Sequence, residues 1–182
     1  MLKLSENPPV TFPDGKSVRD FEGKWWVAHT KARNEKALAW DLMGKGISYF
    51  LPLVSKASKT PKGRVVRSLV PLFSSYLFFC GDETARIETL RTHRVANIIP
   101  CTSVEHFVNE LWSIEKAIES GADLKPYNFI EVGQKCRVMA GPLMGTEGIV
   151  VRTSKETRLI LQIDMLGQAT SVDIEADLLE LI

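Results

Sequence analysis

The sequence predicts an α+β protein in two parts, an antiparallel sheet flanked by helices and then a small five-stranded β-barrel. Hydrophobic residues recur with mixed helical and strand spacing up to about residue 120, and with the period of two typical of β-strands after about residue 130. The 182 residues, 45% of them hydrophobic, suffice for one medium or two small hydrophobic cores. This composition, with a net charge of only +1, excludes a disordered chain.

The first part alternates strand-like and helix-like segments. Leu38 and Leu42 recur at the i, i+4 spacing of a helix that Gly44 ends, and residues 102–105 have the pattern of a capping box before another helix. Residues 55–64, rich in Ser, Lys, Pro and Gly, predict a basic loop or hairpin tip. We expect strands at 25–30, 47–53, 65–70, 76–80 and 95–99, and helices at 34–43, 83–91 and 104–121.

The second part follows a short stretch in which Gly, Asp and Pro lie close together, the composition of a linker. Five short strands in about fifty residues can bury a core only by curling into a barrel. We expect those strands at 135–139, 148–152, 158–165, 169–174 and 178–182. The predicted division is a flexible arm at 1–22, a first domain at 23–120, a linker at 121–130 and a second domain at 131–182.

The near-zero net charge conceals an uneven distribution. Residues 126–182 carry five basic and eight acidic side chains, a net of −3, whereas residues 1–125 carry a net of +4. Between Asp41 and Asp82 there is no acidic residue. Such an asymmetry indicates two modules with different partners, and only the first suits a nucleic acid. The bases of that acid-free stretch are Lys45, Lys56, Lys59, Lys62, Arg64 and Arg67.

Several classes of protein are excluded. The longest apolar stretch, around residues 70–80, is about half the ~20 residues that a membrane-spanning helix needs, and the first residues lack the apolar core of a signal peptide. Three cysteines cannot form a closed disulfide framework, which favours the reducing cytoplasm. These cysteines are Cys80, Cys101 and Cys136.

No catalytic, cofactor or metal site is predicted. The three histidines, His29, His93 and His106, have no cysteine or carboxylate at the spacing of a metal site or a catalytic triad. No glycine-rich loop is followed by the Lys-Ser/Thr pair that would cradle a phosphate. We therefore expect a binding protein and not an enzyme.

Four motifs carry a family resemblance. The segment GPLMGTEG at 141–148 places glycines at a tight turn and resembles the KOW motif, which opens a small SH3-like barrel, and residues 166–172 resemble the stretch that follows it. Near the start, KWWV at 24–27 and PLFSSYLFF at 71–79 resemble strands of the NusG N-terminal domain. Within PLFSSYLFF, Ser74 and Ser75 stand where that family usually has Pro-Gly or Pro-Asn. From about residue 23 onward the chain resembles NusG-family transcription elongation and antitermination factors, closest to the specialised RfaH-like members.

The resemblance implies a docking surface for RNA polymerase. Members of this family bind the clamp helices of the polymerase through an apolar cavity, and exposed aromatic side chains are suitable anchors for a partner helix. The alternative is that these residues are ordinary core. A second contact across the polymerase cleft falls on Thr84, and bridging the cleft favours its closed, pause-resistant state. The matching anchors are Phe73 and Tyr76, with Tyr49, Phe50, Leu72 and Ile99 as neighbours.

The resemblance also implies a contact with the non-template DNA strand. Phosphate contacts require charge and reach, which Lys and Arg provide. The alternative is a solvated, highly charged hairpin tip. The residues concerned are Lys31, Arg33, Lys56, Lys59, Lys62, Arg64 and Arg67.

The barrel is the recruitment module in this family, for a small-subunit ribosomal protein, a termination factor or neither. Its exposed turn comprises Gly141, Pro142, Leu143, Met144 and Gly145. The sequence leaves open whether this module refolds as helices and masks the first domain, and whether the outcome is antitermination or termination. The competing interpretation is a KOW-type RNA-binding protein of the ribosome, which predicts a basic barrel, whereas this one has a net charge of −3.

Overall fold

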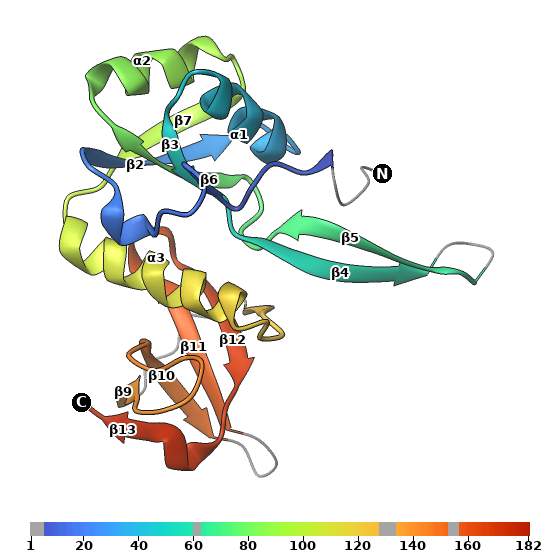
Figure 1. Ribbon diagram of the computed structural model, residues 1–182, viewed down its shortest axis with the longest axis vertical. Coiled ribbons are helices and arrows are strands. Elements are labelled where there is room, and N and C mark those ends of the chain that lie inside the picture. Colours follow the sequence, from blue (N-terminus) through green and yellow to red (C-terminus); the bar gives the residue numbers. More distant parts are fainter. Residues whose placement is uncertain (1–5, 60–62, 128–133, 153–156) are drawn as a thin grey trace. The chain divides into compact units, whose positions relative to one another are not determined.

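The computed structural model describes residues 6–59, 63–127, 134–152 and 157–182, and the chain forms two compact units, residues 1–102 (unit 1) and 103–182 (unit 2) (Figure 1). The predicted division lay at the linker, 121–130. The observed division comes earlier because helix α3 (Val104–Glu119) packs against strands β10 (Glu147–Arg152) and β11 (Thr157–Ile163). The helix therefore belongs to the C-terminal unit.

Unit 1 contains the predicted antiparallel sheet. Its strand order is β1-β3-β6-β2-β7, and every pairing is antiparallel. The expected strands at 25–30, 76–80 and 95–99 are confirmed to within a residue at each end. The strands are β1 (Thr11–Phe12), β3 (Ser48–Phe50), β6 (Tyr76–Gly81), β2 (Lys24–Thr30) and β7 (Val95–Pro100).

One face of this sheet is covered by the helices α1 (Glu35–Gly44) and α2 (Glu83–Arg91), both close to their predicted bounds. The spacing that predicted α1 is the spacing that buries it, because Leu38, Ala39 and Leu42 all lie fully inside the core. Successive strand residues point to opposite faces, so only alternate residues of each strand join this core. Its strand members include Ala28, Tyr49, Leu77 and Phe79.

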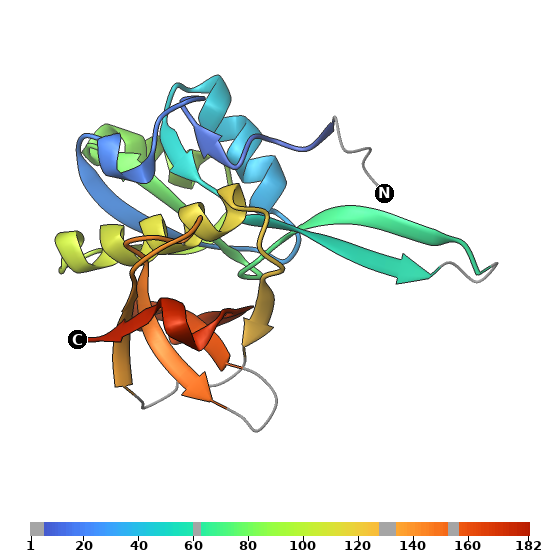
Figure 2. The same cartoon turned by 60° about the horizontal axis from the view of Figure 1, so that its bottom comes forward.

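The basic stretch forms a two-stranded hairpin, β4 (Leu53–Lys59) with β5 (Val65–Pro71). It extends away from the five-stranded sheet of its own unit in both Figure 1 and Figure 2. The predicted strand at 47–53 is thus divided between β3 and β4, separated by Pro52, whose carbonyl accepts a hydrogen bond from Leu72 N. Strand pairing also runs further into the predicted loop at 55–64, as far as Lys59.

Residues 6–22, predicted as a flexible arm, instead pack on unit 1. Strand β1 pairs with β3 and extends the sheet by one strand. A short 3-10 helix, η2 (Val18–Asp20), has a capping box at Ser17, and Val18 is fully buried. The polar composition of this segment concealed the few apolar side chains that attach it, among them Phe21, whose ring stacks on Trp25.

Unit 2 contains the five expected strands and one more. Its sheet has the order β13-β9-β10-β11-β12-β8, in which β8 (Lys125–Tyr127) lies within the predicted linker and pairs with β12. Between β13 and β8 no pairing occurs among the described residues, so closure into a barrel is not confirmed. The remaining elements are β9 (Gln134–Val138), β12 (Gln168–Asp173), β13 (Leu179–Leu181), η3 (Asp164–Leu166) and η4 (Ala176–Leu178).

Strand β11 is buried on both of its faces. Leu159, Leu161 and Ile163 lie on one face and Ile160 on the other, and none is more than 1% exposed. A sheet with one solvated face would bury only alternate residues. The packing of α3 on β10 and β11 accounts for the additional burial.

The start of α3 differs from the prediction in one detail. Its N-cap is Ser103, and no side chain caps the helix, so the capping box expected at 102–105 does not form. Among the described residues, α3 is the longest helix at 16 residues, and no helix there has the length and apolar content needed to span a membrane.

Candidate functional site

The strand register separates the predicted anchors onto two faces of the sheet in unit 1. Phe50 pairs with Phe78, Phe78 with Val27, and Val27 with Ile99, so these four residues form a continuous row across β3, β6, β2 and β7. We call them the apolar row. It lies on the face opposite to α1, because the alternate residues of the same strands form the core beneath that helix.

Tyr49 lies on the other face. It belongs to the core beneath α1, is fully buried, and donates its hydroxyl to the carbonyl of Pro9 at 3.2 Å. Burial raises the pKa of its phenol. For Tyr49 the structure therefore favours the ordinary core alternative over a docking anchor.

The remaining anchors gather at the turn between β5 and β6, beside the apolar row. The ring of Phe73 meets that of Phe78 edge-on, with centroids 6.2 Å apart, and Tyr76 stacks on His29 at 5.1 Å. Phe73 is 2% exposed and Leu72 is 4% exposed, so neither is the exposed anchor that the sequence suggested. Tyr76 and Ile99 are half-buried and remain accessible.

Backbone contacts fix this turn. Ser75 has a φ of 67°, in the left-handed region that favours glycine, at the position where the resembling family usually has Gly or Asn. Its N–H donates to the buried carboxylate of Glu35 at 2.7 Å, and its carbonyl accepts from Thr30 N at 2.8 Å. The turn is therefore held by both α1 and β2.

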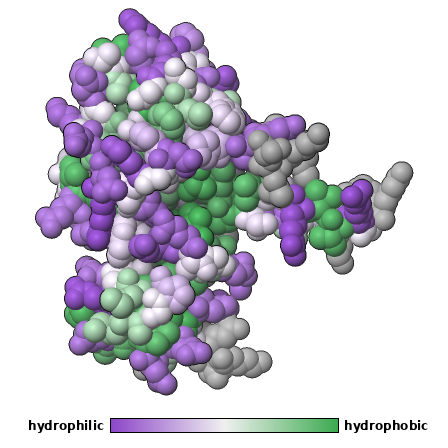
Figure 3. Space-filling view, in the orientation of Figure 1, coloured by the Kyte–Doolittle hydropathy of each residue, from purple (hydrophilic) through white to green (hydrophobic). Residues whose placement is uncertain are grey.

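The predicted DNA-contacting bases lie in two places. Lys31 and Arg33 are exposed in the connection between β2 and α1. Lys56, Arg64 and Arg67 are exposed in the β4–β5 hairpin or beside its strands, and hydrophilic and hydrophobic residues lie next to one another along that hairpin (Figure 3). Lys62 lies outside the described residues, as does the side chain of Lys59.

The hairpin does not present its bases on a single face. Arg67 pairs with Ala57, whereas Lys56 pairs with Ser68, and neighbouring positions of a strand point in opposite directions. Lys56 and Arg67 therefore project from opposite faces. The positive charge of the hairpin is therefore distributed over both of its faces and does not form one flat basic surface.

Thr84 is exposed in the first turn of α2. The helix is capped by Asp82, whose side chain accepts a hydrogen bond from Ala85 N at 2.9 Å. The neighbouring Glu83 forms an ion pair with Arg86, which lowers the pKa of the Glu83 carboxyl. The geometry thus leaves the Thr84 hydroxyl at an accessible helix start.

In unit 2, the glycine-rich turn at 141–145 has the expected tight geometry. Gly141 and Gly145 have φ values of 83° and 84°, and Met144 N donates to Gly141 O. Leu143, expected near the surface, is only 8% exposed, whereas Met144 is 64% exposed. A Cβ placed on Gly145 would lie 3.3 Å from the ring of Trp112, so α3 packs directly over this turn.

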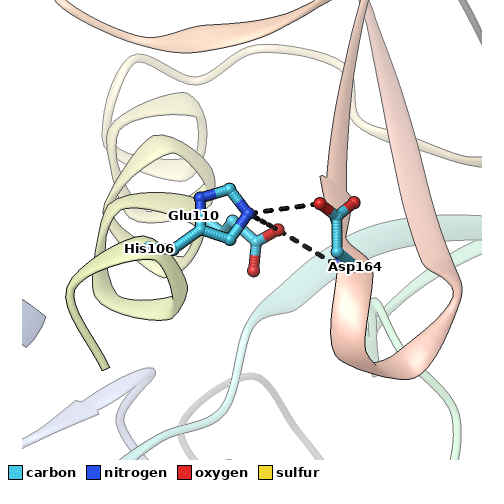
Figure 4. A group of neighbouring side chains, drawn as sticks. All are labelled: His106, Glu110 and Asp164. Carbon is cyan, nitrogen blue, oxygen red and sulfur yellow. Dashed lines mark hydrogen bonds and ion pairs between the residues drawn. The ribbon is translucent and has the colours of Figure 1, made fainter. Parts of the chain in front are cut away.

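A cluster of three side chains that the sequence did not predict involves helix α3. His106 and Glu110 on α3 converge with Asp164, which follows β11 (Figure 4). The expectation that His106 has no carboxylate at ligand spacing is wrong, since Glu110 follows it by four residues on one helix face. That spacing was the available signal, whereas Asp164 is brought in only by packing.

Comparison with known proteins agrees with the motifs in unit 1. The family model described as transcription termination factor NusG matches residues 23–118. Among curated proteins no match was found. A chain in the crystal structure of the MjSpt4:Spt5 complex, conformation B, is 17% identical over 87% of this chain and 96% of that chain, with a TM-score of 0.27. Since the family model covers more than half of the sequence, the chain belongs to the NusG family of transcription factors.

Proposed function

We propose that this chain is a cytoplasmic transcription elongation factor of the antitermination type, which binds RNA polymerase through unit 1 and performs no chemistry of its own. The family match over residues 23–118 carries the proposal, since it spans the whole five-stranded sheet except β1. Within the family, the PLF and YLFF motifs around Ser74 and Ser75 favour a relationship to the RfaH-like members.

The docking surface is the edge of the apolar row together with the turn at 73–76. Tyr76 and Ile99 are accessible, whereas docking through Phe50 or Phe73 requires that these buried rings become exposed. An aromatic and a branched aliphatic side chain beside a packed apolar layer are suitable anchors for the clamp helices of the polymerase.

Thr84 supplies the second contact, on the opposite side of the polymerase cleft. A factor that binds both sides stabilises the closed, elongating state over the paused one. The shift in population cannot exceed the difference between its binding free energies for those states. Antitermination by this mechanism requires only that the protein bind the polymerase, and no catalytic step.

The test of docking is the affinity of the full-length protein for RNA polymerase. Tyr76→Ala and Ile99→Ala are expected to weaken binding by about tenfold or more each, because truncation of a central anchor costs about 2 kcal/mol. Leu90→Ala is the matched control, since Leu90 is 42% exposed on the outside of α2. Unchanged affinity in both variants contradicts this docking surface.

The exposed bases of the β4–β5 hairpin, with Lys31 and Arg33, contact the non-template DNA strand through its phosphates. Their scatter over both hairpin faces supports backbone contact and not the reading of bases. In elongation complexes, Lys56→Ala with Arg67→Ala is expected to reduce the salt dependence of binding. If the salt dependence does not change, the hairpin is merely a solvated surface.

The turn at 141–145 recruits a protein partner, a small-subunit ribosomal protein or a termination factor, through Met144 and the neighbouring Met139, which is 51% exposed. Methionine is adaptable and suits such a surface. Met144→Ser is expected to weaken the contact. Salt-sensitive binding of ribosomal RNA by this chain, without binding of polymerase, would instead establish the KOW-type ribosomal alternative.

Transcription in vitro through a pause site and a terminator separates the outcomes. We expect more read-through and shorter pauses when the protein is present. Increased termination would overturn the antitermination assignment while leaving the family assignment intact.

A further inference from the structure

The cluster of His106, Glu110 and Asp164 has no role in the proposed function. His106 Nε2 lies 3.1 Å from Asp164 Oδ2 and 3.2 Å from Glu110 Oε1. The candidate donor atoms of all three side chains lie within 4.8 Å of one another (Figure 4). An imidazole nitrogen and two carboxylate oxygens are thus directed at one point between α3 and the turn after β11.

These separations match the dimensions of a metal site. Zn²⁺ binds His nitrogen and carboxylate oxygen at about 2.0–2.2 Å, and a tetrahedral arrangement then places neighbouring donors about 3.3–3.5 Å apart. The observed distances of 3.1 and 3.2 Å from the imidazole therefore need to open only slightly. The i, i+4 placement of His106 and Glu110 lets one helix face supply two donors.

Hydrogen bonds around the cluster orient its ligands. Gln162 Nε2 donates to Asp164 Oδ1 at 2.7 Å, which leaves Oδ2 directed at the imidazole. The backbone N–H of Asp164 donates to Glu110 Oε1 at 3.0 Å. Metal ligands in proteins are commonly held by such outer contacts, and their loss weakens metal binding.

The charges of the cluster favour a cation. Two carboxylates share a single imidazole, and the Glu110 side chain is only 10% exposed. A bound cation would stabilise both carboxylates in their charged forms.

We propose that His106, Glu110 and Asp164 form a binding site for a divalent transition-metal ion of the Zn²⁺ class, which fastens α3 to the turn after β11. The His106 and Asp164 side chains are 54% and 49% exposed, so water completes the coordination on the open side. Nitrogen and carboxylate donors of this kind select Zn²⁺ and similar ions over Mg²⁺, which prefers oxygen alone. The ion acts as a structural link within unit 2.

The test uses the full-length protein without a histidine tag, stripped with a chelator and titrated with Co²⁺ as a spectroscopic substitute for Zn²⁺. We expect one equivalent to produce the intense visible absorption of tetrahedral Co²⁺, without the charge-transfer band that thiolate ligands give. Zn²⁺ should abolish this absorption and raise the Tm of the protein.

Substitutions locate the site. His106→Ala and Asp164→Asn should abolish both the absorption and the Zn²⁺-dependent rise in Tm, and Gln162→Ala should weaken binding roughly tenfold or more. The matched controls are His93→Asn, an exposed histidine whose φ of 59° asparagine tolerates, and Glu105→Gln, an exposed carboxylate adjacent to His106. Both control variants should bind Co²⁺ as the wild-type protein does.

Either of two results overturns the proposal. One is Co²⁺ absorption that persists in His106→Ala, which would place the ion elsewhere. The other is an unchanged spectrum with the wild-type protein, in which case the three side chains form a hydrogen-bonded contact without a metal. Because the His106 side chain is 54% exposed, its truncation should leave the fold intact, and circular dichroism checks that each variant is folded.

Discussion

The carboxylate of Glu35 accepts a hydrogen bond from the backbone N–H of Ser75 at 2.7 Å, and this contact joins the first turn of α1 to the turn between β5 and β6. Glu35 is 7% exposed, so the bond is shielded from water. Ser75 holds a φ of 67°, which costs free energy for any residue other than glycine. Tertiary contacts therefore maintain a turn that the local sequence does not favour.

Removing this carboxylate should destabilise unit 1. Glu35→Ala is expected to lower the free energy of unfolding by about 1–3 kcal/mol, because it leaves the partly buried N–H of Ser75 without its carboxylate partner. Glu83→Ala is the control, since its ion pair with Arg86 lies at the surface, where solvent screens the two charges. Urea denaturation measures both, and equal losses would contradict a special role for Glu35.

The conformation of Ser75 leads to a second prediction. Ser75→Val should lower the stability by roughly 1–3 kcal/mol, because a β-branched side chain is strained in the left-handed region. Ser75→Gly should be tolerated. Ser74→Val, at the exposed neighbouring position, provides the comparison. Thermal unfolding measures the Tm of the three variants. Similar Tm values for the two valine variants would show that the φ of Ser75 does not determine the loss of stability.

Gly148 should be essential to the packing of β10 on β11. A Cβ at this position would lie 2.5 Å from Ile160 O and 2.9 Å from Leu159 Cδ1. Gly148→Ala is therefore expected to cost about 1–3 kcal/mol through overpacking. At Gly44, where a Cβ would meet nothing within 4 Å, the same substitution should be neutral or slightly stabilising. Comparable losses in both variants would refute the packing argument.

The stability of metal-free protein should depend on the ionisation of Glu110. Burial raises the pKa of this carboxyl from 4.5 to about 7 in the folded state, so the folded state holds a proton that the unfolded state has released between those pH values. Stability from this group is thus fully present below about pH 4.5 and is lost as the pH rises to about 7.

The measurement is the urea midpoint of wild type and Glu110→Gln, with a chelator present, from pH 4.5 to 7.5. Wild type should lose stability relative to the variant over that range, since glutamine does not titrate. The charged groups of His106, Asp164 and Lys135 face Glu110, and the substitution removes none of these three side chains. Parallel pH profiles would contradict the raised pKa.

Most elements of secondary structure could be predicted because their signals are local. The period of two located β9 to β12, and the i, i+4 repeat located α1, each to within about two residues. The capping box of α3 and the flexible arm failed for a related reason. A cap depends on the backbone geometry at Ser103, and the arm is held by contacts that its polar composition does not reveal.

The predicted anchors show where such reasoning ends. Alternation along β3 placed Tyr49 and Phe50 on opposite faces, but only the tertiary structure decided which face α1 covers. Tyr49 therefore became core and Phe50 joined the apolar row. Exposure was equally undetermined, because Phe73 and Tyr76 belong to one motif and only Tyr76 remains accessible.

By itself, the sequence determined the order of the strands and helices, the positions of the tight turns, the opposite charges of the two parts and the family, because periodicity, glycines, charge and motifs are local properties of the chain. Only the tertiary structure decided that α3 packs on the C-terminal strands and that Asp164 meets Glu110, 54 residues away. Contacts between distant segments depend on how whole faces pack, and no local pattern records that choice.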